Sequence, residues 1–155
     1  MSVEEQEQKD FQITEKIMDS IFNTYGAHVE ITPTSRYCAY DANMTVTKSN
    51  KHKRYTIEIK ERNVDSIEDL ETLPLKVKKY CNIMEKTKYD ETPLIIYLVN
   101  NSNYFIFNLK ALDLNNLNLR NWTIAKMQYT DKRQYEEQPT FFIPISCCIY
   151  NGIIN

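Results

Sequence analysis

Two carboxylates and one lysine are the side chains of this sequence whose types and spacing are best suited to chemistry. Asp41 lies near the start of the stretch YDANMTVTKSNKHKRYTIEIK, and Glu58 and Lys60 lie at its end. Mg²⁺ binds through one or two carboxylates, keeps several waters and also takes substrate phosphate oxygens. An ammonium beside the ion can orient an attacking water or stabilise charge developing on the phosphate. Brought together around one metal ion, these three side chains would suffice to hydrolyse a phosphodiester.

Apolar and polar residues alternate through this stretch, which predicts two strands over about 37–47 and 54–61. The apolar positions are 42, 44 and 46 in the first strand and 55, 57 and 59 in the second. Pairing apolar positions on one face places Asp41 on the same face as Glu58 and Lys60. A two-residue Ser49-Asn50 turn would set Asp41 opposite Glu58, whereas a turn at Asn50-Lys51 would set it opposite Lys60.

A solvated sheet surface is the competing interpretation of the same pattern. Exposed strand faces commonly carry cross-strand pairs of Asp, Glu and Lys. The Glu-x-Lys spacing is also unspecific, because Glu7-Gln8-Lys9 repeats it in the polar N-terminal lead. The strand pair alone leaves both interpretations open.

Hydrophobic periodicity and turn residues predict the other elements. A first helix is expected over about 10–25, followed by a short strand over 28–32. A helical region should begin near 63, break or restart at Pro74 and continue to about 87. The apolar run 93–100 predicts a buried strand with 104–108 as its hairpin partner, before a short helical or turn segment over 109–117. Two further strands are expected over 122–129 and 140–150, and Pro144 suggests that the second is an edge strand.

This order of elements and charges resembles the PD-(D/E)XK nuclease superfamily, particularly its small phage and bacterial members. The resemblance covers about residues 10–110 and implies a single restriction-endonuclease-like α/β domain over 1–155, with a mixed central sheet flanked by helices. Residues 1–9 would form a disordered lead, and about 120–150 a C-terminal strand extension. One departure is that Tyr40 precedes Asp41, where the superfamily often has proline.

The resemblance implies a role for each charged residue. Asp41, Glu58 and the backbone carbonyl of Ile59 would bind Mg²⁺ or Mn²⁺, and Lys60 would be catalytic in DNA hydrolysis. Glu15 is the candidate for a glutamate that many members add from the first helix, although it could equally be a solvated charge at the helix edge. The rival function is a nuclease-like domain that no longer cleaves and serves as a nucleic-acid-binding or structural component of a phage or mobile element. The intact set of charges favours the enzyme.

A basic turn and one lysine are the candidate nucleic-acid contacts. The turn would supply local phosphate affinity, or it could serve to protect a sheet edge and keep the protein soluble. The superfamily often places a substrate-facing basic residue on the helix after the metal-binding strand, a position that Lys79 occupies here, although most lysines on helix surfaces are only solvated. The four basic residues of the turn are Lys48, Lys51, Lys53 and Arg54.

Composition and charge limit the remaining possibilities. The 155 residues, of which 42% are hydrophobic and 26% charged, suffice for one globular domain with a real core. The net charge of −2 argues against a general polyanion binder, so any DNA contact must be local. The four cysteines form no C-x-x-C pair, and we expect them to be reduced core residues in a cytosolic protein. No apolar run is long enough to span a membrane, and the many dimers among small superfamily members suggest a homodimer.

Overall fold

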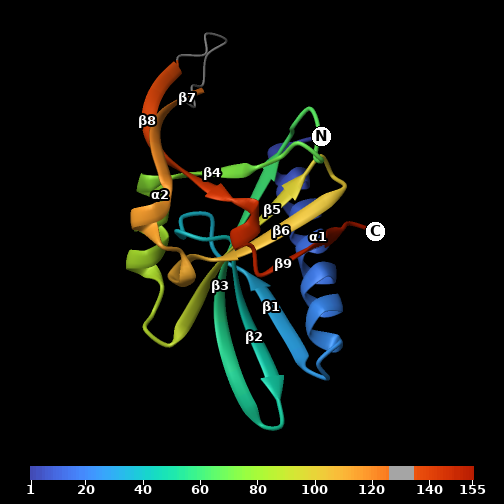
Figure 1. Ribbon diagram of the computed structural model, residues 1–155. Helices are drawn as coiled ribbons and strands as arrows, with labels where there is room; N and C mark the ends of the chain where they lie inside the picture. Colours follow the sequence, from blue (N-terminus) through green and yellow to red (C-terminus); the bar gives the residue numbers. More distant parts are fainter. Residues whose placement is uncertain (126–134) are drawn as a thin grey trace.

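A six-stranded mixed sheet with strand order β1-β2-β3-β5-β6-β9 forms the centre of the protein (Figure 1). The computed structural model describes residues 1–125 and 135–155. Strands β3 and β5 are parallel, and every other neighbouring pair in this sheet is antiparallel. The α/β class expected from the sequence is therefore confirmed. The six strands are β1 (His28–Pro33), β2 (Ala42–Lys48), β3 (Lys51–Arg62), β5 (Glu91–Val99), β6 (Asn103–Asn108) and β9 (Tyr150–Ile153).

The β2–β3 hairpin follows the first of the two registers that the sequence left open. Ser49 and Asn50 form its turn with φ values of 51° and 62°, the left-handed backbone that a two-residue hairpin turn with matching twist requires. Lys48 lies opposite Lys51, and the same register sets Ala42 opposite Ile57. The paired register ends there, and Asp41, the residue before Ala42, meets β3 through a hydrogen bond from its N–H to the Ile57 carbonyl and through side-chain contact with Glu58.

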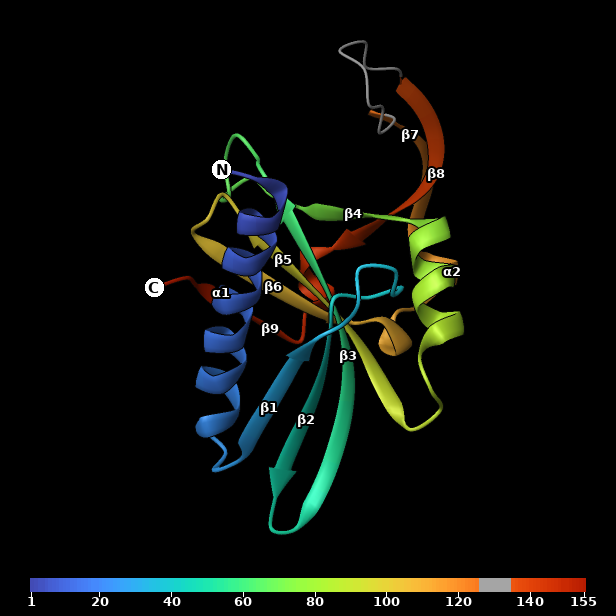
Figure 2. The ribbon, with the colours of Figure 1, turned by 180° about the vertical axis from the view of Figure 1, so that it is seen from behind.

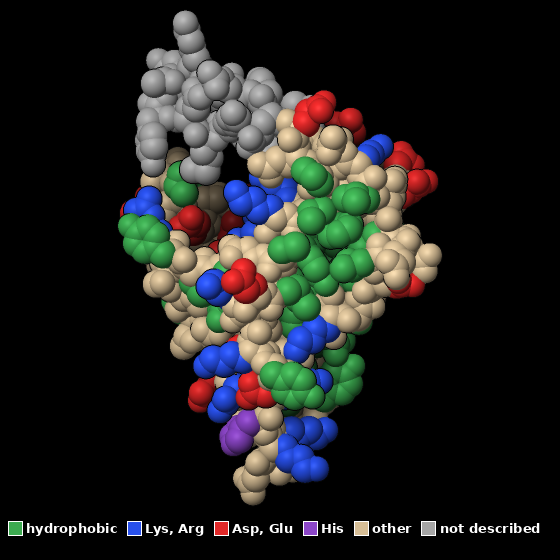
Figure 3. Space-filling model, turned by 90° about the vertical axis from the view of Figure 1, so that its left-hand side faces the viewer, with side chains coloured by type: hydrophobic (Ala, Val, Ile, Leu, Met, Phe, Trp, Pro, Cys, Tyr) green, Lys and Arg blue, Asp and Glu red, His purple; other side chains and the backbone are tan. Residues whose placement is uncertain are grey.

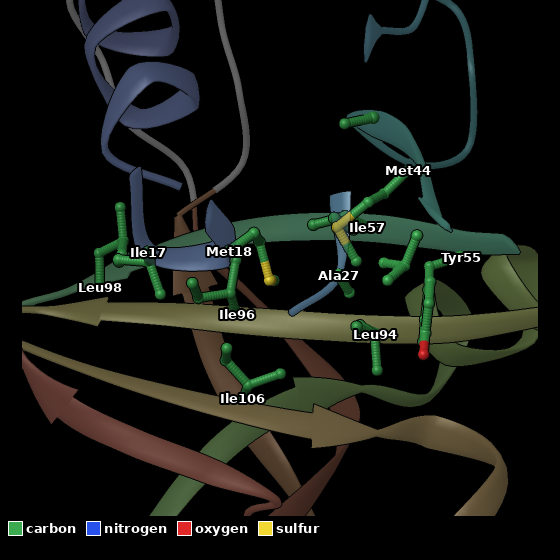
Figure 4. Packing of buried hydrophobic residues seen from close by; sticks show 12 residues of the cluster. Ile17, Met18, Ala27, Met44, Tyr55, Ile57, Leu94, Ile96, Leu98 and Ile106 are labelled. Carbon is green, nitrogen blue, oxygen red and sulfur yellow. The ribbon is translucent and has the colours of Figure 1, made fainter. Parts of the chain in front are cut away.

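Two helices cover opposite faces of this sheet (Figure 2). Helix α1 (Val3–Asn23) packs against a cluster that includes Ile57, Ile59 and Ile96, on the face that we call the α1 face. Figure 4 shows Ile17 and Met18 of this helix beside the strand residues Ile57, Ile96 and Leu98. Helix α2 (Val77–Lys86) packs through Ile83 onto the other face, the α2 face, with Ile95 and Tyr97. Because side chains alternate along a strand, the neighbours of Ile57 and Ile59 in β3 project toward the α2 face.

Helix α1 begins earlier than expected. Of the lead over 1–9, predicted to be disordered, residues 3–9 form the first turns of α1 instead. Ser2 caps the helix: its backbone N–H donates to Glu5 Oε2 at 2.7 Å, and its Oγ accepts from the Glu5 N–H at 3.1 Å. The S-x-x-E spacing of a capping box is the sequence signal for this start.

A second sheet, of three strands in the order β4-β8-β7, was only partly anticipated. Its strands are β4 (Thr72–Lys76), β8 (Tyr135–Pro144) and β7 (Asn118–Ala125), and the β7–β8 pair curves away from the main sheet (Figure 1). Residues 64–71 are not helical, and Pro74 lies inside the edge strand β4 rather than at a helix break. The expected strand over 122–129 corresponds to the end of β7, and its positions 126–129 lie outside the described residues.

The C-terminal segment also differs from expectation. Pro144 ends β8, which is the central strand of its sheet, so the prediction of an edge strand was wrong. Because Pro144 is the last residue of β8, its missing N–H does not interrupt the hydrogen bonds in the middle of the strand. A 3₁₀ turn over Ile145–Cys147 follows, and β9 then joins the main sheet beside β6. The 3₁₀ turns Leu109–Ala111 and Leu114–Asn116 confirm the helical or turn segment expected over 109–117.

The four cysteines are free, but only Cys148, which packs against the core cluster on the α2 face, fits the expectation of core residues. Cys81 and Cys147 are exposed, and Cys38 and Cys148 are half-buried. Neither helix in the described part of the chain is both long and apolar enough to cross a bilayer.

Candidate active site

Asp41 is held at the point where β3 extends past the beginning of β2. Its backbone N–H donates to the carbonyl of Ile57 at 2.8 Å, and its Oδ2 accepts the backbone N–H of Ile59 at 2.7 Å. The carboxylate therefore takes the place of a strand neighbour for this part of β3. Its carbonyl accepts the Thr34 N–H at 2.9 Å, which ties the preceding loop to the end of β1.

The carbonyl of Ile59 points toward the same side of β3 as Asp41. In a strand, the N–H and C=O of one residue project to the same side, and alternate residues project to opposite sides. Because the Ile59 N–H binds Asp41, its carbonyl is directed toward Asp41 and away from β5. This is the orientation that a backbone metal ligand between the two carboxylates requires.

Glu58 is a buried carboxylate, with only 3% of its side chain exposed, and it projects toward the α2 face. Burial, reinforced by contact with the Asp41 carboxylate, raises the pKa of Glu58 to about 8. Lys79 of α2 opposes that rise, because its Nζ lies 2.5 Å from Glu58 Oε2. The same ammonium donates to the carbonyl of Ala39 at 2.9 Å, so it joins α2 to the loop before Asp41.

Lys60 lies two residues beyond Glu58 and shares its face of β3. Burial lowers the pKa of Lys60, the charge of Glu58 opposes this shift, and Lys79 reinforces it. Arg62, a further two residues along the same face, also lowers the pKa of Lys60. Sequence reasoning missed Arg62; its alternating register with Glu58 and Lys60 was the available signal.

The arrangement fits a hard divalent cation. Glu58 Oε2 is buried and, among the described residues, has no hydrogen-bond donor at an acceptable angle, although Lys79 is close enough for an ion pair. No group of three or more His, Cys, Asp or Glu side chains that could hold a metal occurs in the described part of the chain. An ion here would rely on Asp41, Glu58, the Ile59 carbonyl and water, a set that suits Mg²⁺ or Mn²⁺ because Mg²⁺ retains several waters.

The other predicted residues are more dispersed. Glu15 is half-buried on α1, which packs on the face of the sheet opposite to Glu58, and its catalytic role stays a prediction. Lys79 contacts Glu58, and its predicted contact with substrate stays a prediction. The four basic residues of the hairpin divide between the two faces. Only Arg54 shares the α2 face with Glu58, and it pairs with Asp90 at 3.5 Å.

No protein-family model, curated protein or solved structure matches the chain. The functional interpretation therefore depends on the geometry around Asp41, Glu58 and Lys60. Two interacting carboxylates, a backbone carbonyl directed toward one of them and the half-buried ammonium of Lys60 come there from one hairpin.

Replacing Glu58 by Gln should remove a pH dependence from the stability of the metal-free protein. The pKa of Glu58 is raised from 4.5 to about 8, so the folded protein retains a proton that the unfolded chain has released. Stability from this group is complete below about pH 4.5 and is lost as the pH rises through about 8. Lys60, whose pKa is lowered, contributes the opposite slope toward more alkaline pH, and it is present in both proteins.

We expect the melting temperature of the wild type in EDTA to fall between about pH 5 and about pH 8, and that of Glu58→Gln to fall much less. Exposed Glu68 provides a matched control, and Glu68→Gln should follow the wild type. Parallel curves for Glu58→Gln and the wild type would show that Glu58 is not held protonated by burial.

Proposed function

We propose that this protein is a metal-dependent nuclease of the PD-(D/E)XK type with a restriction-endonuclease-like fold, and that it hydrolyses DNA. One observation carries the proposal: Asp41 and Glu58 contact each other where β2 and β3 separate, with Lys60 on the same face of β3 as Glu58. A solvated sheet surface would leave all three groups in water, whereas Glu58 is buried, Lys60 is half-buried and only Asp41 is exposed. Buried, mutually perturbed ionisable groups are more typical of a functional site.

The connectivity supports the same proposal. Helix α1, the antiparallel strands β1, β2 and β3, helix α2, and β5 parallel to β3 follow in the order on which the resemblance was based. Strand β4 and its partners β8 and β7 are additions to that order. These three strands form a separate sheet and do not interrupt the order of the strands in the main sheet.

Some of the side chains would bind the metal ion, and others would stabilise charge on the phosphate. Asp41, Glu58 and the Ile59 carbonyl would hold the ion, which polarises the phosphate and lowers the pKa of a bound water. Lys60 would stabilise the negative charge that develops on the phosphate oxygens. Lys79 contacts Glu58, and with a metal ion held by Glu58 it would be available to a substrate phosphate.

Cleavage assays with defined substrates test the proposal. Purified protein is incubated with single-stranded, duplex and branched DNA, and with RNA, in Mg²⁺, Mn²⁺ or EDTA. We expect phosphodiester cleavage of DNA that requires the divalent ion and stops in EDTA. If no substrate is cut and calorimetry detects no binding of Mn²⁺, the nuclease proposal is wrong.

The contact between Lys79 and Glu58 favours a second candidate function, that of a nuclease-like domain that binds nucleic acid without cutting it. The Lys79 ammonium, 2.5 Å from Glu58 Oε2, gives the buried carboxyl group a partner without any metal, so a non-cleaving domain would be stable. DNA binding that is unaffected by EDTA and never followed by cleavage would favour this alternative. The cytosolic location and the homodimer stay predictions.

A further inference from the structure

The basic side chains of the β2–β3 hairpin lie mainly on the face opposite the candidate active site. The register pairs Lys48 with Lys51 and Val46 with Lys53. Val46 belongs to the core cluster beneath α1, so these three lysines share the α1 face. Figure 3, which views the molecule from the side of α2, shows Lys and Arg side chains gathered at the narrow end of the molecule, with hydrophobic and acidic side chains among them.

A groove of about 720 Å³ lies beside these lysines, between the hairpin and the end of α1. Its wall contains the rings of Phe22, Tyr25, Tyr55 and Tyr150. Phe22 connects this group, with ring centroids 6.0 Å from Tyr55 and 6.4 Å from Tyr150. Tyr25 is 54% exposed, so part of the aromatic surface is open to a ligand.

The charges around the groove are of one sign. The described residues that line it include Lys48, Lys51 and Lys53 but no Asp or Glu. None of the ion pairs found among the described residues involves these three lysines. Like charges directly opposite each other in an antiparallel pair are destabilising, and Lys48 faces Lys51 in this way. An anionic ligand would relieve this repulsion.

We propose that this groove binds a short single-stranded segment of nucleic acid, with bases against the tyrosine rings and phosphates against the lysines. Aromatic rings beside a positively charged groove are the usual means of binding single strands, because every base has a face that can stack. A duplex hides those faces between its base pairs. Lys53, with Nζ 5.6 Å from the Tyr55 ring centroid, places charge and aromatic surface side by side.

This site is separate from the metal chemistry, so it can be tested without cleavage. Fluorescence anisotropy in EDTA would compare a labelled oligothymidylate, an oligouridylate and a duplex of equal length. We expect both single strands to bind more tightly than the duplex, because the recognition uses base faces and phosphates that DNA and RNA share.

Three variants separate the contribution of base stacking from that of phosphate contacts. Tyr25→Leu should weaken single-strand binding by at least about fivefold without changing its salt dependence, and Tyr25→Phe, which keeps the ring, should bind as the wild type. Lys48→Gln with Lys51→Gln should reduce the slope of log affinity against log salt by about 1.4, since each phosphate contact on a single strand contributes about 0.7. Exposed Lys9 and Lys16 on α1 give the control, and their joint change to Gln should leave the slope unchanged.

Equal affinity for duplex and single strands, or unchanged binding by Tyr25→Leu, would overturn the proposal and leave only a general attraction for polyanions. An unchanged salt slope in the double lysine variant would overturn it as well. Either result could coexist with metal-dependent cleavage, so failure of this site is distinguishable from failure of the nuclease proposal.

Discussion

Lys60→Ala should reduce the rate of DNA cleavage at saturating substrate by about 100-fold to 1000-fold while leaving metal affinity nearly unchanged. Removing one preorganised donor to developing charge has an effect of that size in other enzymes. Lys60 is half-buried, and its side chain projects from the same face of β3 as that of Glu58. It is not a ligand of the ion, so the effect should appear in kcat.

Two control variants separate the effect of where the lysine lies from the effect of its positive charge. Lys78 is an exposed lysine of α2, and Lys78→Ala should cut at the wild-type rate. Lys60→Arg keeps a positive charge and should retain more activity than Lys60→Ala. Calorimetric titration with Mn²⁺ checks that the ion still binds. Cleavage by Lys60→Ala at the wild-type rate would place the active site on other residues.

The hairpin at the centre of the site was predictable because its evidence is local. Alternation of apolar residues predicted the faces of both strands and placed Asp41 on the same face as Glu58 and Lys60. The pattern could not decide between the two registers, because Ser49-Asn50 and Asn50-Lys51 are both plausible turns. The structure adopts positive φ at Ser49 and Asn50, and this backbone choice sets which charge meets Asp41.

The contacts that sequence reasoning missed join segments far apart in the chain. Strand β4 pairs with β8 at positions such as Leu73 and Ile143, and nothing in either short segment indicates the other. Strand preference depends strongly on such partners, and the region before α2 was therefore expected to be helical. The contact of Lys79 with Glu58 was missed for the same reason, because the position of Lys79 on α2 suggested a substrate contact or a solvated charge and gave no sign of a buried partner.

Asp41→Asn should abolish detectable cleavage and weaken Mn²⁺ binding by at least about tenfold to 100-fold. Mutating a residue that only hydrogen-bonds to a metal ligand typically weakens metal binding by about tenfold to 100-fold. Asp41 would be a ligand itself, so its loss should weaken binding at least as much. The exposed Asp69 offers a matched control, and Asp69→Asn should bind Mn²⁺ and cut DNA as the wild type does. Wild-type Mn²⁺ affinity in Asp41→Asn would remove this residue from the metal site.

The same substitution should not destabilise the metal-free protein, which distinguishes a ligand from a structural residue. Asn retains an oxygen that can accept the Ile59 N–H, a bond of 2.7 Å in the wild type. It also removes the negative charge that helps to raise the pKa of Glu58, so Glu58 becomes easier to ionise beside Lys79. We therefore expect the melting temperature of Asp41→Asn in EDTA near pH 8 to equal or exceed that of the wild type. Asp41→Ala should melt lower than both, because the Ile59 N–H would lose its acceptor. A destabilised Asn variant with an equally destabilised Ala variant would mean that the carboxylate charge supports the fold rather than a metal ion.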